Sequence, residues 1–250
     1  MGNITFEGVI TRNYDNGTNT DIPTNIKLLK PFAFHGSESY LTSINIPNTI
    51  SHLPDYAFSA CAYITTISGL EHVEYIGENC FLDSGRSSQL KIDTITISAG
   101  TVIDEQAFYR AKIKNVVIGN NCVLKQNAFM SSTLETLIVG IGVENARLGF
   151  QSCAELTTVT YNADVCAESM FSGCSVLNSI TFSNIRRIHT AAFNNCKALT
   201  SIDIPSTITS IANNAFNGCT NLTSITIDRP QDSIADAPWG ATNATVTWTG

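Results

Sequence analysis

Cysteine and histidine are the residue types of this chain that could do chemistry, as disulfide partners, metal ligands or nucleophiles. The sequence holds eight Cys and four His. Cysteines predict disulfides or a zinc site only where their sulfur atoms can converge. Five of the eight instead share one recurring position, three residues after a phenylalanine: Cys61, Cys153, Cys174, Cys196 and Cys219. We therefore expect a ladder of small buried thiols that point the same way, an orientation unsuited to disulfides or to tetrahedral zinc.

The remaining candidate motifs are weaker. His35, His52, His72 and His189 stand at four different distances from the nearest recurring phenylalanine, so we expect surface or turn positions and no ligand cluster. The segment 15–21 has oxygen-bearing side chains at alternate positions, but Gly17 has no side chain that could serve as a ligand. We therefore favour a loop, with a calcium site as the alternative. The sequence lacks a glycine-rich phosphate loop, a Gly-x-Ser-x-Gly elbow and a His-Glu-x-x-His motif. We expect no cofactor, no metal and no catalysis.

The elements that position these residues follow from a repeat anchored on phenylalanine. Successive anchors are 24, 23, 27, 21, 21, 21, 22 and 23 residues apart. This period is too short for a pair of helices, so each unit is one small coil. The anchors are Phe34, Phe58, Phe81, Phe108, Phe129, Phe150, Phe171, Phe193 and Phe216.

Each coil contains two apolar walls. In the clearest unit, Ile202 and Ile204 lie two residues apart, which predicts a strand with one buried side. Ile208 and Ile211 precede Phe216 by eight and five residues and form the second wall. Because a coil of about 22 residues cannot bury its own apolar side, the coils must stack with their strands parallel and in register.

The repeated pattern Leu-Thr-Ser-Ile-x-Ile-Pro-x-x-Ile-x-x-Ile-x-x-x-Ala-Phe-x-x-Cys resembles the BspA-like leucine-rich repeats, over residues 25–228. The fold class that we predict is a leucine-rich-repeat solenoid of about nine coils. It is a right-handed, β-rich coil stack with one parallel sheet on the concave side and short turns or 3-10 segments on the other side. Departures from the pattern occur at Cys80, Gly149 and Cys166. The resemblance implies a secreted or surface-exposed bacterial protein that serves adhesion or protein binding.

The ends of the chain break the repeat. We predict a capping strand and loop over residues 1–24, about nine repeats over 25–228, and a C-terminal cap over 229–250 in which Trp239 and Trp248 cover the last core layer. The longest step between anchors contains the polar segment Asp83–Gln89, which we expect to bulge into solvent.

Composition excludes several classes of partner. Charged residues make up 14% of the chain and the formal net charge is -7, with no basic cluster, so nucleic acid is an unsuitable partner. The sequence has no run of the roughly 20 apolar residues that crossing a bilayer requires, so we expect no membrane insertion. Its first residues do not form a secretory signal. We predict a monomer at the cell surface or secreted, through a signal that was removed or by another route, with a cytoplasmic or virion location as the alternative.

The outward side of the predicted strands carries mostly hydroxyl groups, with one local exception. Val117 and Ile138 occupy the same position of consecutive coils and form an apolar pair amid threonines. Beside them Asp93, Lys114 and Glu135 share another position, which predicts a ladder of alternating charges. The candidate partner-binding residues are Lys114, Val117, Glu135, Thr136, Ile138, Thr158 and Thr160.

The sequence thus favours a non-enzymatic scaffold that presents a repetitive face to a protein or glycan. A structural spacer, or a component of a phage or other extracellular assembly, is the alternative. The identity of the ligand stays open.

Overall fold

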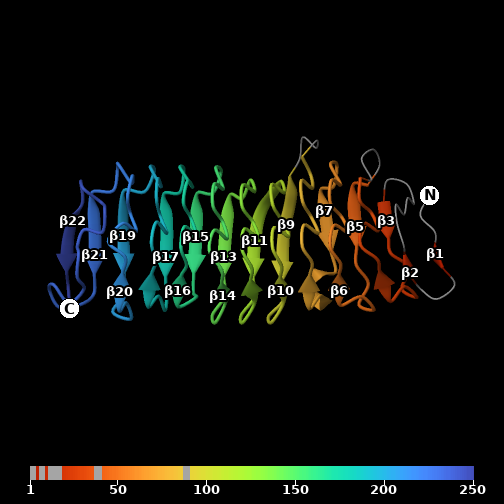
Figure 1. Cartoon of the computed structure of the whole chain (residues 1–250), viewed down its shortest axis with the longest axis horizontal. Helices are drawn as coiled ribbons and strands as arrows, with labels where there is room; N and C mark the ends of the chain where they lie inside the picture. Colours follow the sequence, from red (N-terminus) through yellow and green to blue (C-terminus); the bar gives the residue numbers. More distant parts are fainter. Residues whose placement is uncertain (1–3, 6–8, 11–18, 37–40, 87–90) are drawn as a thin grey trace.

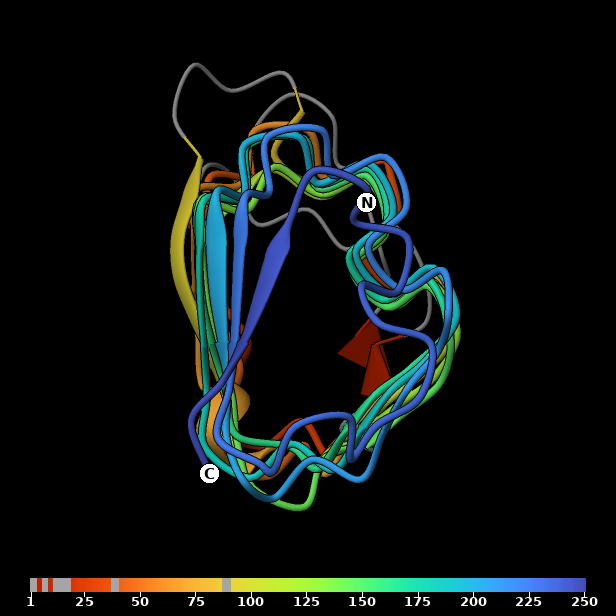
Figure 2. The same ribbon diagram turned by 90° about the vertical axis from the view of Figure 1, so that its left-hand side faces the viewer.

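A computed structural model of the whole chain forms a straight rod of stacked coils (Figure 1). It describes residues 4–5, 9–10, 19–36, 41–86 and 91–250. Seen from the C-terminal end, successive coils overlie one another closely, with the longer strands along one side (Figure 2). The predicted fold class, a leucine-rich-repeat solenoid, is confirmed.

The longer strands form one column, and we call their outward side the long-strand face. Inward and outward side chains alternate along them, as in β13, where Leu137 and Val139 are buried. Neighbours in the column run parallel, with like positions opposite each other. The column comprises β3 (Asn19–Asp21), β5 (Ser43–Asn45), β7 (Thr66–Ser68), β9 (Ile92–Ile97), β11 (Ile113–Ile118), β13 (Thr136–Val139), β15 (Thr158–Tyr161), β17 (Ser179–Phe182), β19 (Ser201–Ile204), β21 (Ser224–Ile227) and β22 (Thr245–Trp248).

The second apolar wall, here called the return wall, also pairs as short parallel strands. Its inward residues are those that precede each phenylalanine by five positions, such as Ile76 and Ile103. The wall comprises β4 (Leu28–Leu29), β6 (His52–Leu53), β8 (Tyr75–Ile76), β10 (Val102–Ile103), β12 (Val123–Leu124), β14 (Glu144–Asn145), β16 (Val165–Cys166), β18 (Arg187–Ile188) and β20 (Ser210–Ile211). A single 3-10 turn, η1 (Leu70–His72), stands among the described residues.

The nine phenylalanines form one continuous file, as predicted. Each is fully buried, and neighbouring rings stack with centroids 4.7–5.7 Å apart and planes within 19°. The widest step joins Phe150 to Phe171, where Gly149 and Met170 replace the alanine that usually precedes the ring. A Cβ on Gly149 would lie 2.7 Å from Met170 Sδ, so the glycine makes room for the methionine of the next coil.

The turn around each phenylalanine uses left-handed backbone. Two residues before the ring, Tyr56, Asn79 and Gln106 have φ values of 53–57°. Two residues after it the same conformation recurs, at Gly173 and Gly218 and also at non-glycine residues such as Ala60. These paired turns reverse the chain on both sides of the buried ring, which explains how a coil this short closes.

The two ends are built differently, and the C-terminal end continues the repeat. At the C-terminus Trp239 takes the place of the phenylalanine: it is fully buried, its carbonyl accepts the Phe216 backbone N–H at 3.0 Å, and β22 pairs with β21 in register. Residues 229–250 thus form one more coil, and Trp248 packs partly buried against Trp239. At the N-terminus β1 (Ile4–Thr5) and β2 (Val9–Ile10) pair antiparallel, and β2 pairs with β4. Residues 87–89 of the predicted bulge at 83–89 lie outside the described residues.

The strand columns are interrupted in a few places. On the long-strand side β7 is not paired with β9, and β17 is not paired with β19. On the return wall β14 and β16 belong to different sheets, next to Asn145, which stands where most coils have isoleucine or leucine. Coil stacking continues across these gaps through the phenylalanine file.

Candidate partner-binding face

The residues that the sequence singled out come together on β11, β13 and β15. Val117 lies opposite Ile138, and Ile138 lies opposite Thr160. Thr136 lies opposite Thr158 in the next column of outward side chains. The predicted register is therefore confirmed, and these positions form one continuous patch of the long-strand face.

The centre of this patch is apolar. Ile138 is 43% exposed, one of the large hydrophobic residues that are exposed in the described part of the chain. Val117 is half-buried beside it, and the flanking threonines offer methyl and hydroxyl groups. The arrangement can supply a small apolar contact surrounded by hydrogen-bonding groups.

Polar side chains along the face are linked across the strands. Thr136 Oγ1 donates to Asn115 Oδ1 at 2.7 Å, and Asn115 Nδ2 donates to Thr94 Oγ1 at 3.2 Å. Ser68 donates to Asn45 Oδ1 at 3.0 Å in an earlier pair of coils. These bonds hold the polar side chains of the face in fixed rotamers.

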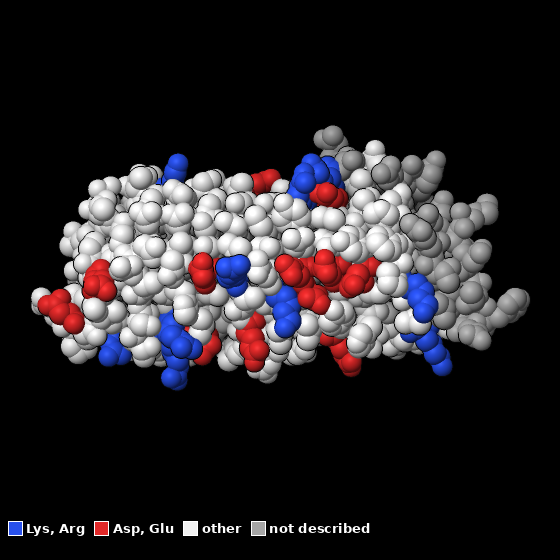
Figure 3. Space-filling view, viewed as in Figure 1, with Lys and Arg blue, Asp and Glu red and all other residues white. Residues whose placement is uncertain are grey.

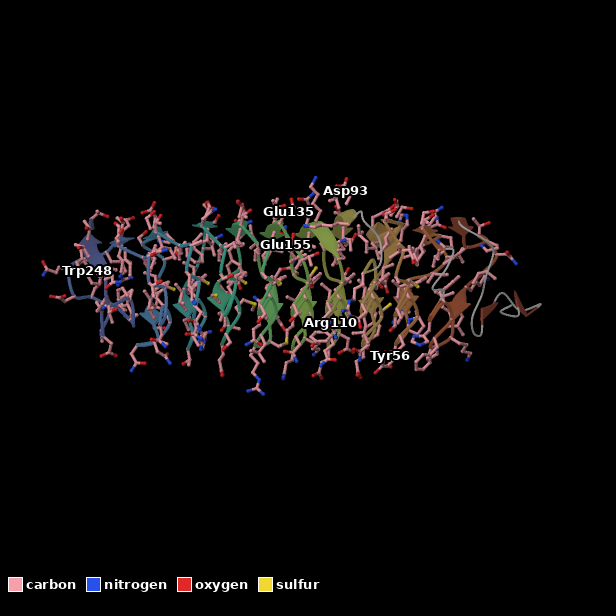
Figure 4. The ribbon with its side chains drawn as sticks, turned by 90° about the horizontal axis from the view of Figure 1, so that it is seen from above. Tyr56, Asp93, Arg110, Glu135, Glu155 and Trp248 are labelled. Atoms are coloured by element: carbon pink, nitrogen blue, oxygen red, sulfur yellow. The ribbon has the colours of Figure 1, made fainter. Side chains whose placement is uncertain are left out.

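The predicted charge ladder is present in the strand register, whereas the ion pairs along it come from another cation. Lys114 does lie between Asp93 and Glu135 in the strand register, but its side chain extends into solvent, and no ion pair among the described residues joins it to either carboxylate. Lys91 takes that role, with Nζ 2.6 Å from Glu135 Oε1 and 2.5 Å from Glu155 Oε2. Figure 4 shows the two glutamates on neighbouring coils.

Electrostatics follow this pairing. The hydrogen bond from Lys91 lowers the pKa of Glu135, and the Lys114 charge lowers it further. Partial burial alone would lower the pKa of Lys91, but its hydrogen bonds to Glu135 and Glu155 raise it. No repeat pattern pointed to the ion pairs of Lys91 with Glu135 and Glu155, because Lys91 precedes its strand and its long side chain reaches over intervening coils.

The cysteine ladder has a structural role that the sequence did not reveal. All eight cysteines are buried and outside any disulfide, which confirms the prediction for the five that share the repeat position. In addition, Cys174 Sγ donates to the Phe150 carbonyl at 3.2 Å, and Cys196 Sγ donates to the Phe171 carbonyl at 3.3 Å. Ser132 makes the same bond, at 3.0 Å, to the Phe108 carbonyl. In these coils the position therefore supplies a small hydrogen-bond donor to the preceding coil, whereas the Phe108 coil has Ala111 there.

A buried polar cluster was also missed. Tyr161 crosses the core from β15, and its hydroxyl donates to the Val165 carbonyl at 2.6 Å. Asn145 Nδ2 donates to the same hydroxyl at 3.0 Å, while Asn145 Oδ1 is buried without a partner. Burial raises the pKa of Tyr161, so the phenol stays neutral and can serve as this donor.

The histidines and acidic residues do not assemble into a metal site in the described part of the chain. His52 stacks on Tyr75 with ring centroids 5.5 Å apart, and His189 is exposed. Most of the segment considered for calcium, residues 15–18, lies outside the described residues. Within the described residues no helix has the length and apolarity that crossing a bilayer needs.

Comparisons with known proteins identify a family with this repeat. The family described as the BspA type leucine rich repeat region matches six copies over residues 12–138 and 145–243. No curated protein sequence matches the chain.

Solved structures with similar folds are distant in sequence. A leucine-rich repeat protein from Bacteroides ovatus ATCC 8483 is 17% identical, with 99% of this chain and 97% of that chain covered and a TM-score of 0.38. A leucine rich cell surface protein from Faecalibacterium prausnitzii A2-165 is 20% identical, with 100% and 93% covered and a TM-score of 0.42. The pneumococcal vaccine antigen PcpA is 17% identical, with 97% and 66% covered and a TM-score of 0.44. On the family match, which spans most of its length, the chain belongs to the BspA-type leucine-rich repeat family.

Proposed function

We propose that this chain is a non-enzymatic binding scaffold, secreted by a bacterium or exposed on its surface, that holds a protein or glycan on its long-strand face. The contact residues are those of the central patch: Lys114, Val117, Glu135, Thr136, Ile138, Thr158 and Thr160. Members of a repeat family present extended surfaces of this kind because each coil adds one more row of outward side chains.

One observation carries the proposal. Val117 and Ile138 are adjacent in register on a face that otherwise carries polar side chains, and Ile138 is 43% exposed. Lys114 and the Lys91–Glu135 pair add charges at the border of this apolar centre. An apolar centre with a polar, charged rim is the usual composition of a protein interface.

The interior supports a role without catalysis. The phenylalanine file and the two apolar walls are buried along the rod. With a core packed in this way, other molecules are expected to bind at the surface rather than in an enclosed cavity.

The test compares two double variants of equal charge. In Val117→Asp, Ile138→Asp the carboxylates fall in the centre of the patch. In Ile141→Asp, Val176→Asp they fall on residues outside the strands, which are 56% and 38% exposed. Both sites are at the surface, so both proteins should fold, as checked by circular dichroism.

Native and variant proteins are immobilised and incubated with host and bacterial surface extracts, and bound components are compared by mass spectrometry. We expect a component that the native protein and the Ile141, Val176 variant retain and that the Val117, Ile138 variant loses. Equal recovery of every component by all three proteins would contradict binding through the patch and would favour a structural spacer.

A further inference from the structure

The long-strand face opens at one point that the central patch does not include. β17 and β19 have the same length and the same alternation of side chains, yet they are not paired, whereas β19 pairs with β21 over four residues. Figure 1 shows the wider gap between these two strands. A depression of about 240 Å³ lies there, lined by residues of β17, β19 and β21 and by Asp228 just beyond them.

Apolar edges form part of the wall of this groove. The inward residues Ile180 and Phe182 of β17 are 9% and 8% exposed, whereas Val159 and Tyr161, which pair with them on β15, are 1% and 0% exposed. The gap therefore uncovers aliphatic and aromatic atoms that the strand ladder covers elsewhere. The backbone groups on the facing edges of β17 and β19 also lack a ladder partner.

Two carboxylates stand at the groove without a compensating charge. Asp203 and Asp228 both line it and both are exposed. Among the described residues neither takes part in an ion pair. Arg229, the adjacent cation, is held by the Ser206 and Ile208 carbonyls at 3.3 and 3.0 Å. The hydroxyl groups of Thr181 and Thr226 add further hydrogen-bond acceptors.

We propose that this groove binds an arginine side chain presented by a partner protein. The aliphatic stem lies over Ile180 and Phe182, and the guanidinium lies between Asp203 and Asp228. An arginine matches both halves of the groove because it joins an apolar stem to a planar group with five donors suited to carboxylates. The volume of about 240 Å³ is below the roughly 300–1,000 Å³ of sites for drug-sized ligands and suits one long side chain.

This inference rests on the proposed scaffold function and names a second contact on the same face. Negative charge alone does not single out the groove. Asp55, Glu78 and Glu105 occupy one position of consecutive coils, three residues before the phenylalanine, and Figure 3 shows a row of carboxylates of this kind across the middle of the rod. That row supplies an internal control for attraction by charge.

The test uses the full chain labelled with ¹⁵N and three short peptides, acetyl-Thr-Arg-Thr-amide and its citrulline and lysine counterparts. Citrulline keeps the shape of arginine but is neutral. Amide chemical shifts are followed as each peptide is titrated into the native protein and two variants. Asp203→Asn, Asp228→Asn removes the two charges of the groove, and Glu78→Gln, Glu105→Gln removes two charges from the control row.

We expect the arginine peptide to shift amides of β17, β19 and β21 in a saturable way and to bind about tenfold more tightly than the citrulline peptide, because it makes charge-assisted hydrogen bonds. The Asp203, Asp228 variant should lose this response, and the Glu78, Glu105 variant should keep it. Equal binding of arginine and lysine peptides, shifts centred on the acidic row, or an unchanged response of the Asp203, Asp228 variant would each overturn the proposal. A failure here leaves the scaffold function intact, since capture through Val117 and Ile138 is measured separately.

Discussion

At the scale of single residues, the file of phenylalanines joins successive coils through ring contacts. Each ring contacts the ring above and the ring below, so it stabilises two interfaces at once. Phe171 lies inside the file, with centroids 5.7 and 5.5 Å from its two neighbours and Tyr161 edge-on at 5.8 Å.

Replacement of Phe171 by alanine should therefore lower the free energy of unfolding by about 3–5 kcal/mol, because burial is lost and a cavity is left between two rings. The measurement is urea denaturation followed by circular dichroism. Val176→Ala, at a side chain that is 38% exposed, serves as the control and should change the free energy by less than about 0.5 kcal/mol. A Phe171 variant as stable as this control would mean that the rings do not hold the coils together.

Gly149 and Met170 form a matched pair one residue before their rings. An alanine at 149 would place its Cβ 2.7 Å from Met170 Sδ, so Gly149→Ala should cost about 1–3 kcal/mol through overpacking. In the double variant Gly149→Ala, Met170→Ala the clash is absent. We expect it to be less destabilised than the two single variants added together, whereas strictly additive effects in the same denaturation experiment would contradict a direct contact.

At the scale of elements, strand pairing in the return wall is interrupted next to a coil that carries a polar residue at the inward position. Asn145 stands in β14 at a position that faces the core, and Tyr161 reaches it from the opposite wall. Hydrogen bonds link Asn145 Nδ2, the Tyr161 hydroxyl and the Val165 carbonyl, whereas Asn145 Oδ1 is buried without a partner and β14 and β16 are unpaired. A polar group buried in this way is costly unless its partner is present.

Tyr161→Phe removes that partner. We expect it to cost about 1–3 kcal/mol, since Asn145 then keeps fewer of its hydrogen bonds. Adding Asn145→Leu should recover part of the loss, because the site becomes apolar like the equivalent positions of other coils. Thermal unfolding of the two single variants and the double variant gives the coupling, and the idea fails if the second substitution only adds to the damage.

The sequence predicted elements better than it predicted side-chain partners. Phenylalanines and inward isoleucines repeat, so their burial and the register of β11, β13 and β15 followed from spacing alone. Asn145, Tyr161 and Lys91 each occur once and act across the core or over intervening coils, where a repeat pattern carries no information. The break between β17 and β19 was equally invisible, because both strands keep the alternation that predicts pairing.

At the scale of the whole molecule, the rod is a one-dimensional array in which each coil packs on its neighbours, with the Lys91 ion pairs as longer-range contacts. Its stability is then a sum of coil terms and interface terms, and a weak interface divides it into units that open separately. Between the Phe193 and Phe216 coils the long strands are unpaired, so this interface depends on the ring contact at 5.4 Å, on the β18–β20 pairing and on hydrogen bonds of the turns, such as the Phe193 N–H donating to the Ala215 carbonyl at 2.9 Å.

We therefore expect residues 199–250 to exchange their amide hydrogens as one block, before the segment 113–182, when urea is raised below the main unfolding transition. Hydrogen exchange read by mass spectrometry on peptic fragments measures this order. Phe193→Ala weakens the one aromatic contact across the gap and should advance exchange of that block selectively, whereas Phe129→Ala, inside the continuous sheet, should not. Exchange of all coils in a single step, in native and variant proteins alike, would show that the unpaired strands do not weaken the array at that point.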